Sequence, residues 1–416
     1  MAKEHEFEFF GPWLGPLGIV FGLPFVCYAA AVGSALGRLP DVPTIMGAVA
    51  KGWRPTLGTV AALAGWMAVT ACLHVALPGQ ICEGAVLASG KRLTYKLNGF
   101  RLLMLVYPTI FYLAFFTPYL DLAWVHDHWL SILSTSILLS FALSLALYIA
   151  SRREGTLLAT GGQTGHLFYD FFIGAELNPR IGSFDLKEFC ELYPGLIGWA
   201  IINLAMAHKQ LQVLGRVTNS MVLVNAFQLL YVVDGLWFER SILTTMDITT
   251  DGFGFMLVFG DLTWVPFIYS LQARYLASNP QDLSLTYSAL VMALNVLGYA
   301  AFRGANSQKD QFRRDPQGPS VRHLKTLKTE SGRQLIVSSW WGTARHINYT
   351  GDWLMGLAWC MACGFSSIVP YFYAVYFATL LVHRDIRDGQ NCQLKYGSDW
   401  KKYCSIVPYR FIPYVY

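Results

Sequence analysis

SSWWGTARHINYTGDW (residues 338–353) and HRDIRDGQNCQLKYGSDWKKYC (residues 383–404) are two polar runs in an otherwise apolar region of the chain. Each run is rich in Arg, His, Asn, Asp, Tyr or Trp. The apolar residues 354–382 between them predict a hairpin that would bring the two runs together beside a membrane. Cations and aromatic planes in such a place form a site for a flat anionic ligand such as a nucleotide. The alternative interpretation is a pair of ordinary positively charged membrane flanks.

The composition is typical of a polytopic membrane protein. The 416 residues are 54% hydrophobic and only 14% charged, and the mean hydropathy is +0.39. Soluble domains usually carry about 25% charged residues. The eight cysteines are scattered and indicate no secreted disulfide framework, and the Cys-x-x-Cys of Cys360 and Cys363 lies in an apolar run that favours packing over redox chemistry.

Apolar runs predict an all-α polytopic membrane protein with about ten transmembrane segments. The expected spans are residues 13–36, 57–77, 102–120, 129–149, 193–207, 221–237, 253–271, 285–302, 353–365 and 368–382. The last two are half-length and form the C-terminal hairpin. We find no internal repeat and no separate soluble domain, so the whole chain, residues 1–416, is interpreted as one membrane domain.

Loop charge predicts the orientation of these spans. The connection 303–351 carries nine Lys or Arg residues, whereas the loop 120–128 carries none. Positively charged loops usually face the cytoplasm, so this connection, the C-terminal run and both termini are expected there. Arg38, Lys51 and Arg54 would then lie on the opposite side and weaken the assignment.

Several ionisable residues fall within or beside the predicted spans. Tyr231 and Asp234 are three apart and share a helix face, and Asp247, Asp251 and Asp261 follow. Polar contacts between helices and a solvated loop are one explanation. The other is a buried acid set that lines a cavity and donates a proton.

Two further motifs carry charged or aromatic residues at informative spacings. Lys309 and Arg313 are four apart in NSQKDQFRRD, so one helical face would present two cations to a phosphate such as the 2′-phosphate of NADPH; a solvated basic face is the alternative. GHLFYDFFIGAELNPR, residues 165–180, is expected to form an ordered loop at the cytoplasmic membrane surface. We find no Rossmann or P-loop fingerprint, no metal-ligand spacing and no nucleic-acid module, so no metal and no nucleic-acid partner is expected.

These motifs resemble those of the membrane sterol reductases, the family of the carbon-14, carbon-7 and carbon-24 reductases and of the reductase domain of the lamin B receptor. The resemblance spans about residues 11–416. GHLFYDFFIGAELNPR and LLVHRDIRDGQNCQLKYG (residues 380–397) are the most specific motifs, and NSQKDQFRR and WWGTARHINYTGDWL also match. The segment LTTMDITTDGFGF, residues 243–255, is most similar to the corresponding sequence of the carbon-14 branch.

The resemblance implies an NADPH site that opens to the cytoplasm. By match to the family's nucleotide positions, the expected cofactor-binding residues are Lys309, Arg313, Ile336, Trp341, Asn348, Tyr349, Asp388, Cys392, Gln393, Leu394, Lys395, Tyr396 and Tyr403. Residues 1–192 would form N-terminal helices and a loop motif. Residues 193–416 would form the catalytic half, which binds sterol and NADPH.

The resemblance also implies a reaction. An 8,14-diene sterol would enter from the bilayer, and protonation followed by hydride transfer from NADPH would reduce the carbon-14 double bond. The expected catalytic residues are Tyr231 and Asp388, and Asp234, Glu239 and Asp247 are further substrate-site candidates.

Two alternatives remain open. One is a reductase of the same family that acts on a 7-dehydrosterol or a 24(28)-sterol, and the other is a sterol-binding membrane protein without activity. The expected location is the endoplasmic reticulum membrane, or the inner membrane of a bacterium, and the expected partners are membrane lipids and the sterol.

Overall fold

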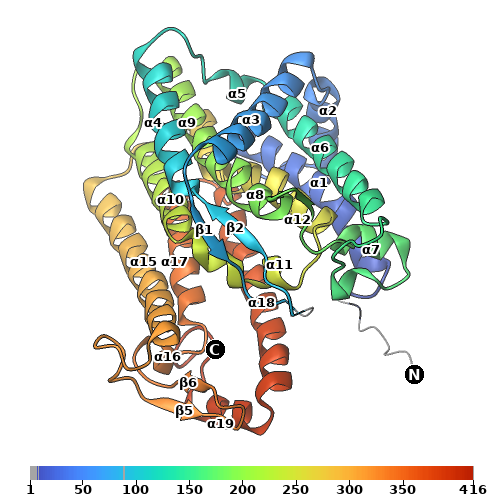
Figure 1. Cartoon of the computed structure of the whole chain (residues 1–416). Coiled ribbons are helices and arrows are strands. Elements are labelled where there is room, and N and C mark those ends of the chain that lie inside the picture. The colour runs from blue at the N-terminus through green and yellow to red at the C-terminus, as the bar shows by residue number, and fades with distance from the viewer. Residues whose placement is uncertain (1–6, 8, 88–89, 416) are drawn as a thin grey trace. The chain divides into compact units, whose positions relative to one another are not determined.

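The computed structural model describes residues 7, 9–87 and 90–415 and is mostly helical (Figure 1). Within these residues, eight helical stretches are long and apolar enough to cross a membrane. They are Leu14–Leu36, Leu57–Ala76, Gly99–Phe116, Trp129–Ala150, Leu186–Leu214, Asn219–Trp237, Phe255–Ser278 and Leu285–Arg314. The prediction of a polytopic membrane protein is confirmed.

Most predicted spans lie within a few residues of the observed helices, because long apolar runs leave little freedom in where a helix lies. Several helical stretches extend beyond their predicted spans. Helix α9 covers Pro194–Leu214 rather than residues 193–207, and α15 covers Leu285–Arg314 rather than residues 285–302. Lys, Gln and Arg, which are good helix formers, continue both helices beyond their apolar parts.

The chain forms two compact units, one up to residue 281 and one from residue 282. The first unit contains α1 (Leu14–Leu36), α2 (Val42–Gly52), α3 (Leu57–Ala76), β1 (Gln80–Glu83), β2 (Thr94–Leu97), α4 (Gly99–Phe116), α5 (Trp124–Asp127), α6 (Trp129–Ala150), η1 (Thr160–Gly162), α7 (Leu167–Ile173), β3 (Arg180–Ile181), β4 (Phe184–Asp185), α8 (Leu186–Leu192), α9 (Pro194–Leu214), α10 (Asn219–Trp237), η2 (Glu239–Thr244), α11 (Met246–Thr249), α12 (Phe255–Phe259), the π-helical η3 (Gly260–Trp264), α13 (Val265–Ile268) and α14 (Leu271–Ser278). The second unit contains α15 (Leu285–Arg314), β5 (Thr326–Lys328), β6 (Gln334–Ile336), α16 (Trp340–Thr343), α17 (Ile347–Met361), η4 (Val369–Tyr371), α18 (Phe372–Tyr396) and α19 (Ser398–Ile406).

Helix α9 is the most buried of the spanning helices in the first unit and packs against α4, α10, α13 and α14. A chain of amides and an indole joins three of these helices. Gln228 of α10 accepts hydrogen bonds from the Trp199 indole (2.9 Å) and the Asn203 amide (2.6 Å) of α9 and donates to Gln272 of α14 (3.0 Å). Buried polar contacts of this kind stabilise helix pairs in a membrane, where apolar burial alone does not select a partner.

The GHLFYDFFIGAELNPR run contains a helix, α7, where a loop was expected. The run ends against the DGFGF residues of the same unit. The Phe253 amide donates to the Glu176 carbonyl at 2.8 Å, and a Cβ on Gly174 would lie 2.3 Å from the Gly254 nitrogen. Only glycine permits this approach of two backbones, so two motifs about 80 residues apart form one structural feature.

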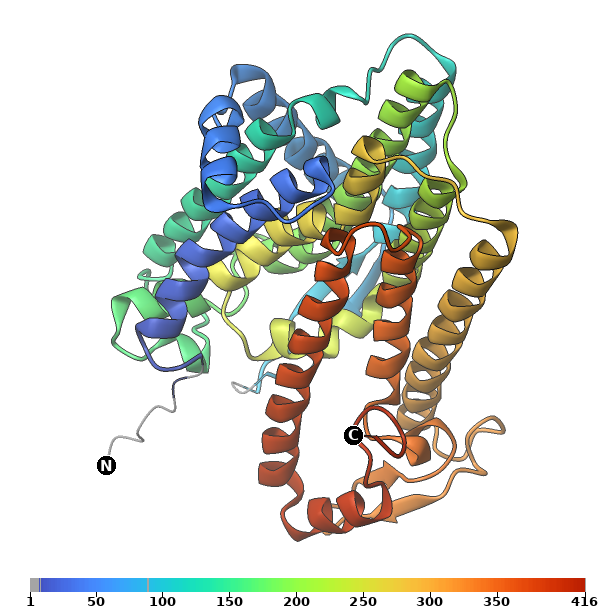
Figure 2. The same ribbon diagram turned by 180° about the vertical axis from the view of Figure 1, so that it is seen from behind.

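In the second unit, α15 lies beside α17, and α17 and α18 form the C-terminal hairpin (Figure 2). Gly298 and Gly351 allow α15 and α17 to approach closely, since a Cβ on Gly351 would lie 2.4 Å from the Phe302 nitrogen. Helix α19 continues from the end of α18. A buried cluster that includes Ile336 and Trp341 packs around the polar end of α15.

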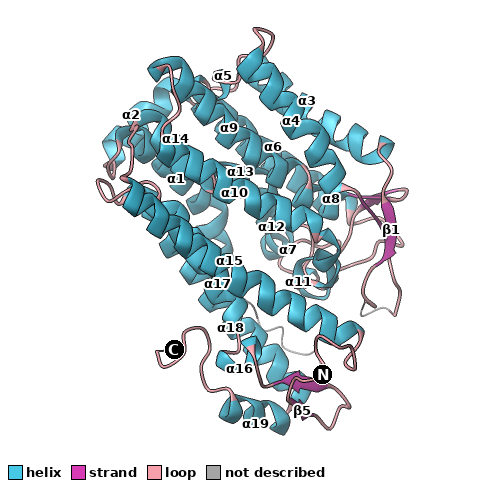
Figure 3. Ribbon diagram, turned by 90° about the vertical axis from the view of Figure 1, so that its left-hand side faces the viewer, coloured by secondary structure: helices cyan, strands magenta, loops and turns pink. Residues whose placement is uncertain are grey.

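Two details of the predicted fold class are wrong. The described residues are not all-α, because β1–β2, β3–β4 and β5–β6 form three antiparallel hairpins (Figure 3). The second arm of the C-terminal hairpin is not half-length, since α18 is a 25-residue helix. Its polar half contains good helix formers and no proline, so the helix continues until Gly397, whose φ is +52°.

Candidate functional site

The polar end of α15 forms one wall of a cluster in the second unit. The Lys309 ammonium lies 4.3 Å from the centroid of the Trp341 ring. The Trp341 indole donates to the Ala305 carbonyl at 2.9 Å, one turn before Lys309 on α15. This bond fixes the ring beside the ammonium, and the contact is a cation–π interaction. Arg313 follows one turn later on the same helix and is exposed.

Tyr349 of α17 and Asp388 of α18 form the second part of the cluster. The Tyr349 hydroxyl donates to Asp388 Oδ2 at 2.8 Å. Burial and the negative charge of Asp388 both raise the pKa of Tyr349 above its ordinary value. The phenol is therefore held as a hydrogen-bond donor, and Asp388 is oriented by it.

The Cys392 thiol interacts electrostatically with both Lys309 of the first part of the cluster and Asp388 of the second. Burial raises the pKa of the Cys392 thiol and Asp388 raises it further, whereas Lys309 and Lys395 act in the opposite direction. These residues come from α15 and from one face of α18. The cluster therefore combines two cations with a carboxylate, a phenol and a thiol.

Sequence reasoning missed a neighbouring set of ionisable groups. Asp385 Oδ1 lies 3.1 Å from His346 Nε2, and Asp385 Oδ2 accepts from Arg410 at 2.8 Å. Burial acts to raise the pKa of Asp385, but His346 and the arginines outweigh it and the pKa is lowered. The His346 ring stacks on Tyr349 at 4.7 Å. The signal was present in the sequence, because Asp385 precedes Asp388 by one helical turn.

The other predicted cofactor residues divide into two groups. Ile336 is buried in the cluster around Trp341. The Asn348 amide donates to Asn306 Oδ1 at 3.2 Å, and its buried Oδ1 has no hydrogen-bond partner among the described residues. Tyr403 is buried and stacks on Trp400 at 5.1 Å.

The remaining residues lie at the end of α18. Gln393 donates to the Gly397 carbonyl at 3.1 Å. Leu394 is 87% exposed, so its side chain is not part of the cluster. Tyr396 stacks on Trp400 at 6.5 Å, and the Lys395 ammonium lies 5.3 Å from the Tyr396 ring centroid.

The other site candidates belong to the first unit. Tyr231 and Asp234 lie one turn apart on α10, as predicted; Tyr231 is half-buried against Trp199 at 5.9 Å and Asp234 is buried. Glu239 accepts a hydrogen bond from the Gly99 amide at 2.8 Å, and burial raises the pKa of Glu239 to about 7. Its carboxyl group thus satisfies an amide at the start of α4.

Asp247 lies on α11, and its backbone carbonyl accepts a hydrogen bond from a buried lysine. The Lys187 ammonium donates to the Asp247 carbonyl and, at 2.8 Å, to the Asp251 carbonyl. Lys187 is completely buried. Among the described residues no group of three or more His, Cys, Asp or Glu side chains could hold a metal ion.

The whole chain is similar to known proteins. It is 47% identical over 418 residues to the Delta(14)-sterol reductase TM7SF2 of Mus musculus, covering 100% of this chain and 99% of that protein. It is 43% identical over 423 residues to the Delta(14)-sterol reductase erg24 of Schizosaccharomyces pombe, covering 100% and 98%. It is 46% identical over 419 residues to the Delta(14)-sterol reductase LBR of Gallus gallus, covering 99% of this chain and 64% of that protein. Residues 43–416 match the family model, and the chain belongs to the ergosterol biosynthesis ERG4/ERG24 family.

Proposed function

We propose that this protein is a Delta(14)-sterol reductase that uses NADPH to reduce the carbon-14 double bond of 8,14-diene sterols. The observation that carries the proposal is identity of 43–47% to Delta(14)-sterol reductases over essentially the whole chain. Identity at this level over full length supports the same reaction, and family membership supports a reduced nicotinamide cofactor. The cluster in the second unit supports the choice of NADPH.

The residues of that cluster fit a dinucleotide phosphate. Lys309 is held beside Trp341, and Arg313 follows on the same helix. Lysine and arginine are the usual partners of phosphate groups. The partnerless Oδ1 of Asn348 is an acceptor for a ribose hydroxyl or an amide. We therefore assign the predicted nucleotide set to NADPH, with Lys309 and Arg313 on the 2′-phosphate.

Bound NADPH would supply the hydride, and the chain must supply a proton and a protected site. Protonation of carbon 15 leaves a positive charge at carbon 14 that is allylic to the second double bond, which is why a diene is the suited substrate. Tyr231 on α10 is the proposed proton donor. Asp388 is the proposed orienting carboxylate, since it already accepts a hydrogen bond from Tyr349. Asp234, Glu239 and Asp247 remain substrate-site candidates.

The proposed membrane arrangement has ten spans, of which the last two are residues 353–365 and 368–382. The nine cations of residues 303–351 support a cytoplasmic position for this connection, for both termini and for the cofactor site. The first six residues and residue 416 lie outside the described part of the chain. We propose residues 193–416 as the catalytic half and the endoplasmic reticulum membrane, or a bacterial inner membrane, as the location.

Anaerobic incubation of the purified protein with NADPH and an 8,14-diene sterol tests the proposal. The expected product is the 8-ene sterol that has gained two hydrogens, one of them deuterium when the cofactor carries deuterium at the transferred position. Parallel reactions with a 7-dehydrosterol and a 24(28)-unsaturated sterol test the sibling activities. Reduction of only one of those substrates would reject the carbon-14 assignment, and sterol binding without any turnover would reject the enzyme.

A further inference from the structure

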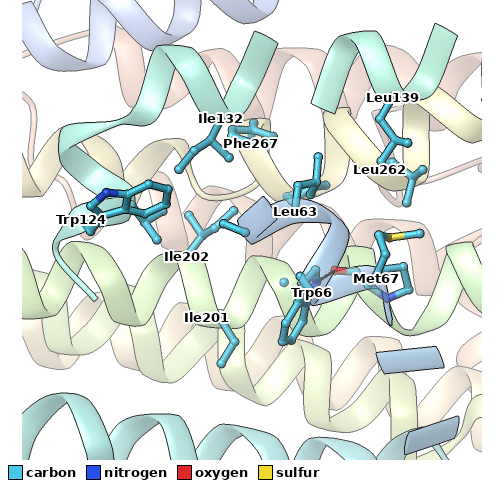
Figure 4. Close-up of a pocket in the computed structure, with 15 residues that line it drawn as sticks. Leu63, Trp66, Met67, Trp124, Ile132, Leu139, Ile201, Ile202, Leu262 and Phe267 are labelled. Carbon is cyan, nitrogen blue, oxygen red and sulfur yellow. Dashed lines mark hydrogen bonds between the residues drawn. The ribbon is translucent and has the colours of Figure 1, made fainter. Parts of the chain in front are cut away.

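An apolar groove opens in the first unit between α3, α6, α9 and α13 (Figure 4). Its empty volume, open side included, is about 810 Å³. Trp124 lies at one end, and Leu139 and Leu262 lie at the other. All of these elements belong to the same compact unit, and the groove contains none of the residues assigned to the sterol or to NADPH.

The lining of the groove selects hydrocarbon. Its side chains are apolar apart from the indoles of Trp66 and Trp124. The Trp66 N–H already donates to the Pro194 carbonyl at 3.0 Å, so it is not available to a ligand. A buried hydroxyl without a partner is costly, so a sterol hydroxyl would not be stable in the interior of the groove.

The length of the groove suits one leaflet of a bilayer. Its lining includes Ile132 and Leu139, seven residues apart on α6. At about 1.5 Å of rise per residue this spacing is about 10 Å. One leaflet contributes about 15 Å to a hydrocarbon core of about 30 Å. Trp124 stacks on His128 at 4.4 Å, and aromatic residues of this type are enriched at the membrane surface, so this end is the mouth.

A polar cluster lies beside this mouth. Trp124 and Val125 of α5 line the groove, and the next two residues, His126 and Asp127, carry the cluster. Asp127 contacts Lys209 at 2.7 Å and His126 at 2.9 Å. The Asp127 carboxylate therefore contacts one lysine and one histidine.

Arg274 adds a second cation that this carboxylate does not neutralise directly. Its side chain is buried, and its one hydrogen bond among the described residues is to the His126 carbonyl at 3.4 Å. The Arg274 Nε–H and the buried Trp129 indole N–H have no hydrogen-bond partner there. A buried guanidinium normally has an anionic oxygen partner.

Trp129 connects this cation to the groove. Its ring packs edge-to-face on Phe267, which lines the groove, with centroids 5.1 Å apart. The Arg274 guanidinium lies 5.0 Å from the centroid of the same ring. The apolar groove and a buried guanidinium whose Nε–H has no hydrogen-bond partner among the described residues thus lie on either side of one indole, and a single lipid molecule would contact both.

We propose that this groove is a structural phospholipid site: an acyl chain lies along α6, and the phosphate oxygens accept hydrogen bonds from Arg274 and Trp129. The ligand class is an anionic glycerophospholipid. The proposal does not depend on the reductase activity, because all of its residues lie outside the assigned catalytic and cofactor sets.

Native mass spectrometry of the full-length protein, delipidated in a mild detergent and titrated with defined ligands, tests the proposal. Dioleoyl phosphatidylglycerol should bind at one site at least tenfold more tightly than dioleoylglycerol, which lacks the phosphate. Inorganic phosphate should not compete at equal concentration, because it lacks the chain. Equal binding of dioleoylglycerol, full competition by inorganic phosphate, or displacement of the phospholipid by cholesterol would each overturn it.

Matched variants locate the site. Arg274→Gln should weaken phosphatidylglycerol at least tenfold and leave dioleoylglycerol unchanged, whereas Arg92→Gln, an exposed arginine on the β1–β2 connection, should change neither. Ala62→Phe fills the groove from its open side and should weaken both lipids, whereas Ala61→Phe, which is exposed and outside the lining, should not. If Arg274→Gln fails to fold, the comparison of lipid binding between Ala61→Phe and Ala62→Phe tests the site by itself. Equal phosphatidylglycerol binding by Ala61→Phe and Ala62→Phe would overturn the site.

Discussion

Lys309→Ala should convert the protein from a strong preference for NADPH to a weak one. The ammonium is held 4.3 Å from the centroid of the Trp341 ring, so its position is fixed before the cofactor arrives. A charge-assisted hydrogen bond to a phosphate contributes about 2 kcal/mol, which corresponds to roughly 30-fold in Kd. NADH lacks the 2′-phosphate, so its Kd should change by less than about threefold.

The assay is a titration of the purified protein with each cofactor. Binding is measured by energy transfer from tryptophan to the bound nicotinamide. Arg314→Ala is the matched control, because Arg314 lies on the same helix, is exposed and pairs with Asp310 at 2.9 Å. It should leave both affinities unchanged. Lys309→Arg should retain most of the preference, since it keeps the charge. Equal loss of NADPH and NADH affinity in Lys309→Ala would refute the assignment and would point to a packing role beneath Trp341.

Three further predictions concern the proton donor, the topology and a buried acid. Tyr231→Phe should lower turnover by about 100-fold and leave NADPH affinity unchanged. Asp388→Asn should lower both turnover and NADPH affinity. Normal turnover in Tyr231→Phe would exclude Tyr231 as the proton donor. A cysteine at the exposed Ser320 should react with an impermeant reagent, above the background of the parent protein, only when the cytoplasmic side is accessible, and labelling from the other side would reverse the orientation. The pKa of Glu239 is raised by burial from 4.5 to about 7. Its contribution to stability is therefore complete below pH 4.5 and is lost as the pH rises through about 7, by about 3 kcal/mol at about 1.4 kcal/mol per pKa unit. Glu239→Gln should remove most of that pH dependence of the melting temperature, and an unchanged slope would contradict the shift.

The long apolar helices could be predicted from the sequence, and the short strands could not. Helices such as α3 and α6 are specified by about 20 apolar residues each, and their bounds match within one residue. Strands of two to four residues, such as β3 and β6, carry too little pattern to be recognised. Their formation depends on side-chain contacts that the sequence pattern does not reveal. One example is the ion pair between Arg180 of β3 and Asp185 at 2.9 Å.

Single side-chain contacts were beyond prediction for a related reason. The residues of the nucleotide set were known from motif resemblance, but not which of them meet. The hydrogen bond from Tyr349 to Asp388 depends on the axial register of α17 against α18, which close packing at Gly356 helps to set: a Cβ there would lie 2.9 Å from the Tyr373 ring. The family resemblance identifies which residues belong to the nucleotide set, but it does not specify the register of α17 against α18.

The uninterrupted length of α18 explains which motif residues join the cluster and which do not. Asp385, Asp388, Cys392 and Lys395 recur at spacings of three, four and three, so a continuous helix presents all of them on one face. Asp385 meets His346, Asp388 meets Tyr349, and Cys392 is affected electrostatically by Lys309. Leu394 lies off this face and is 87% exposed. A helix that ended at residue 382, as the apolar pattern predicted, would have left these positions without a common face, so the polar extension of α18 is what assembles the site.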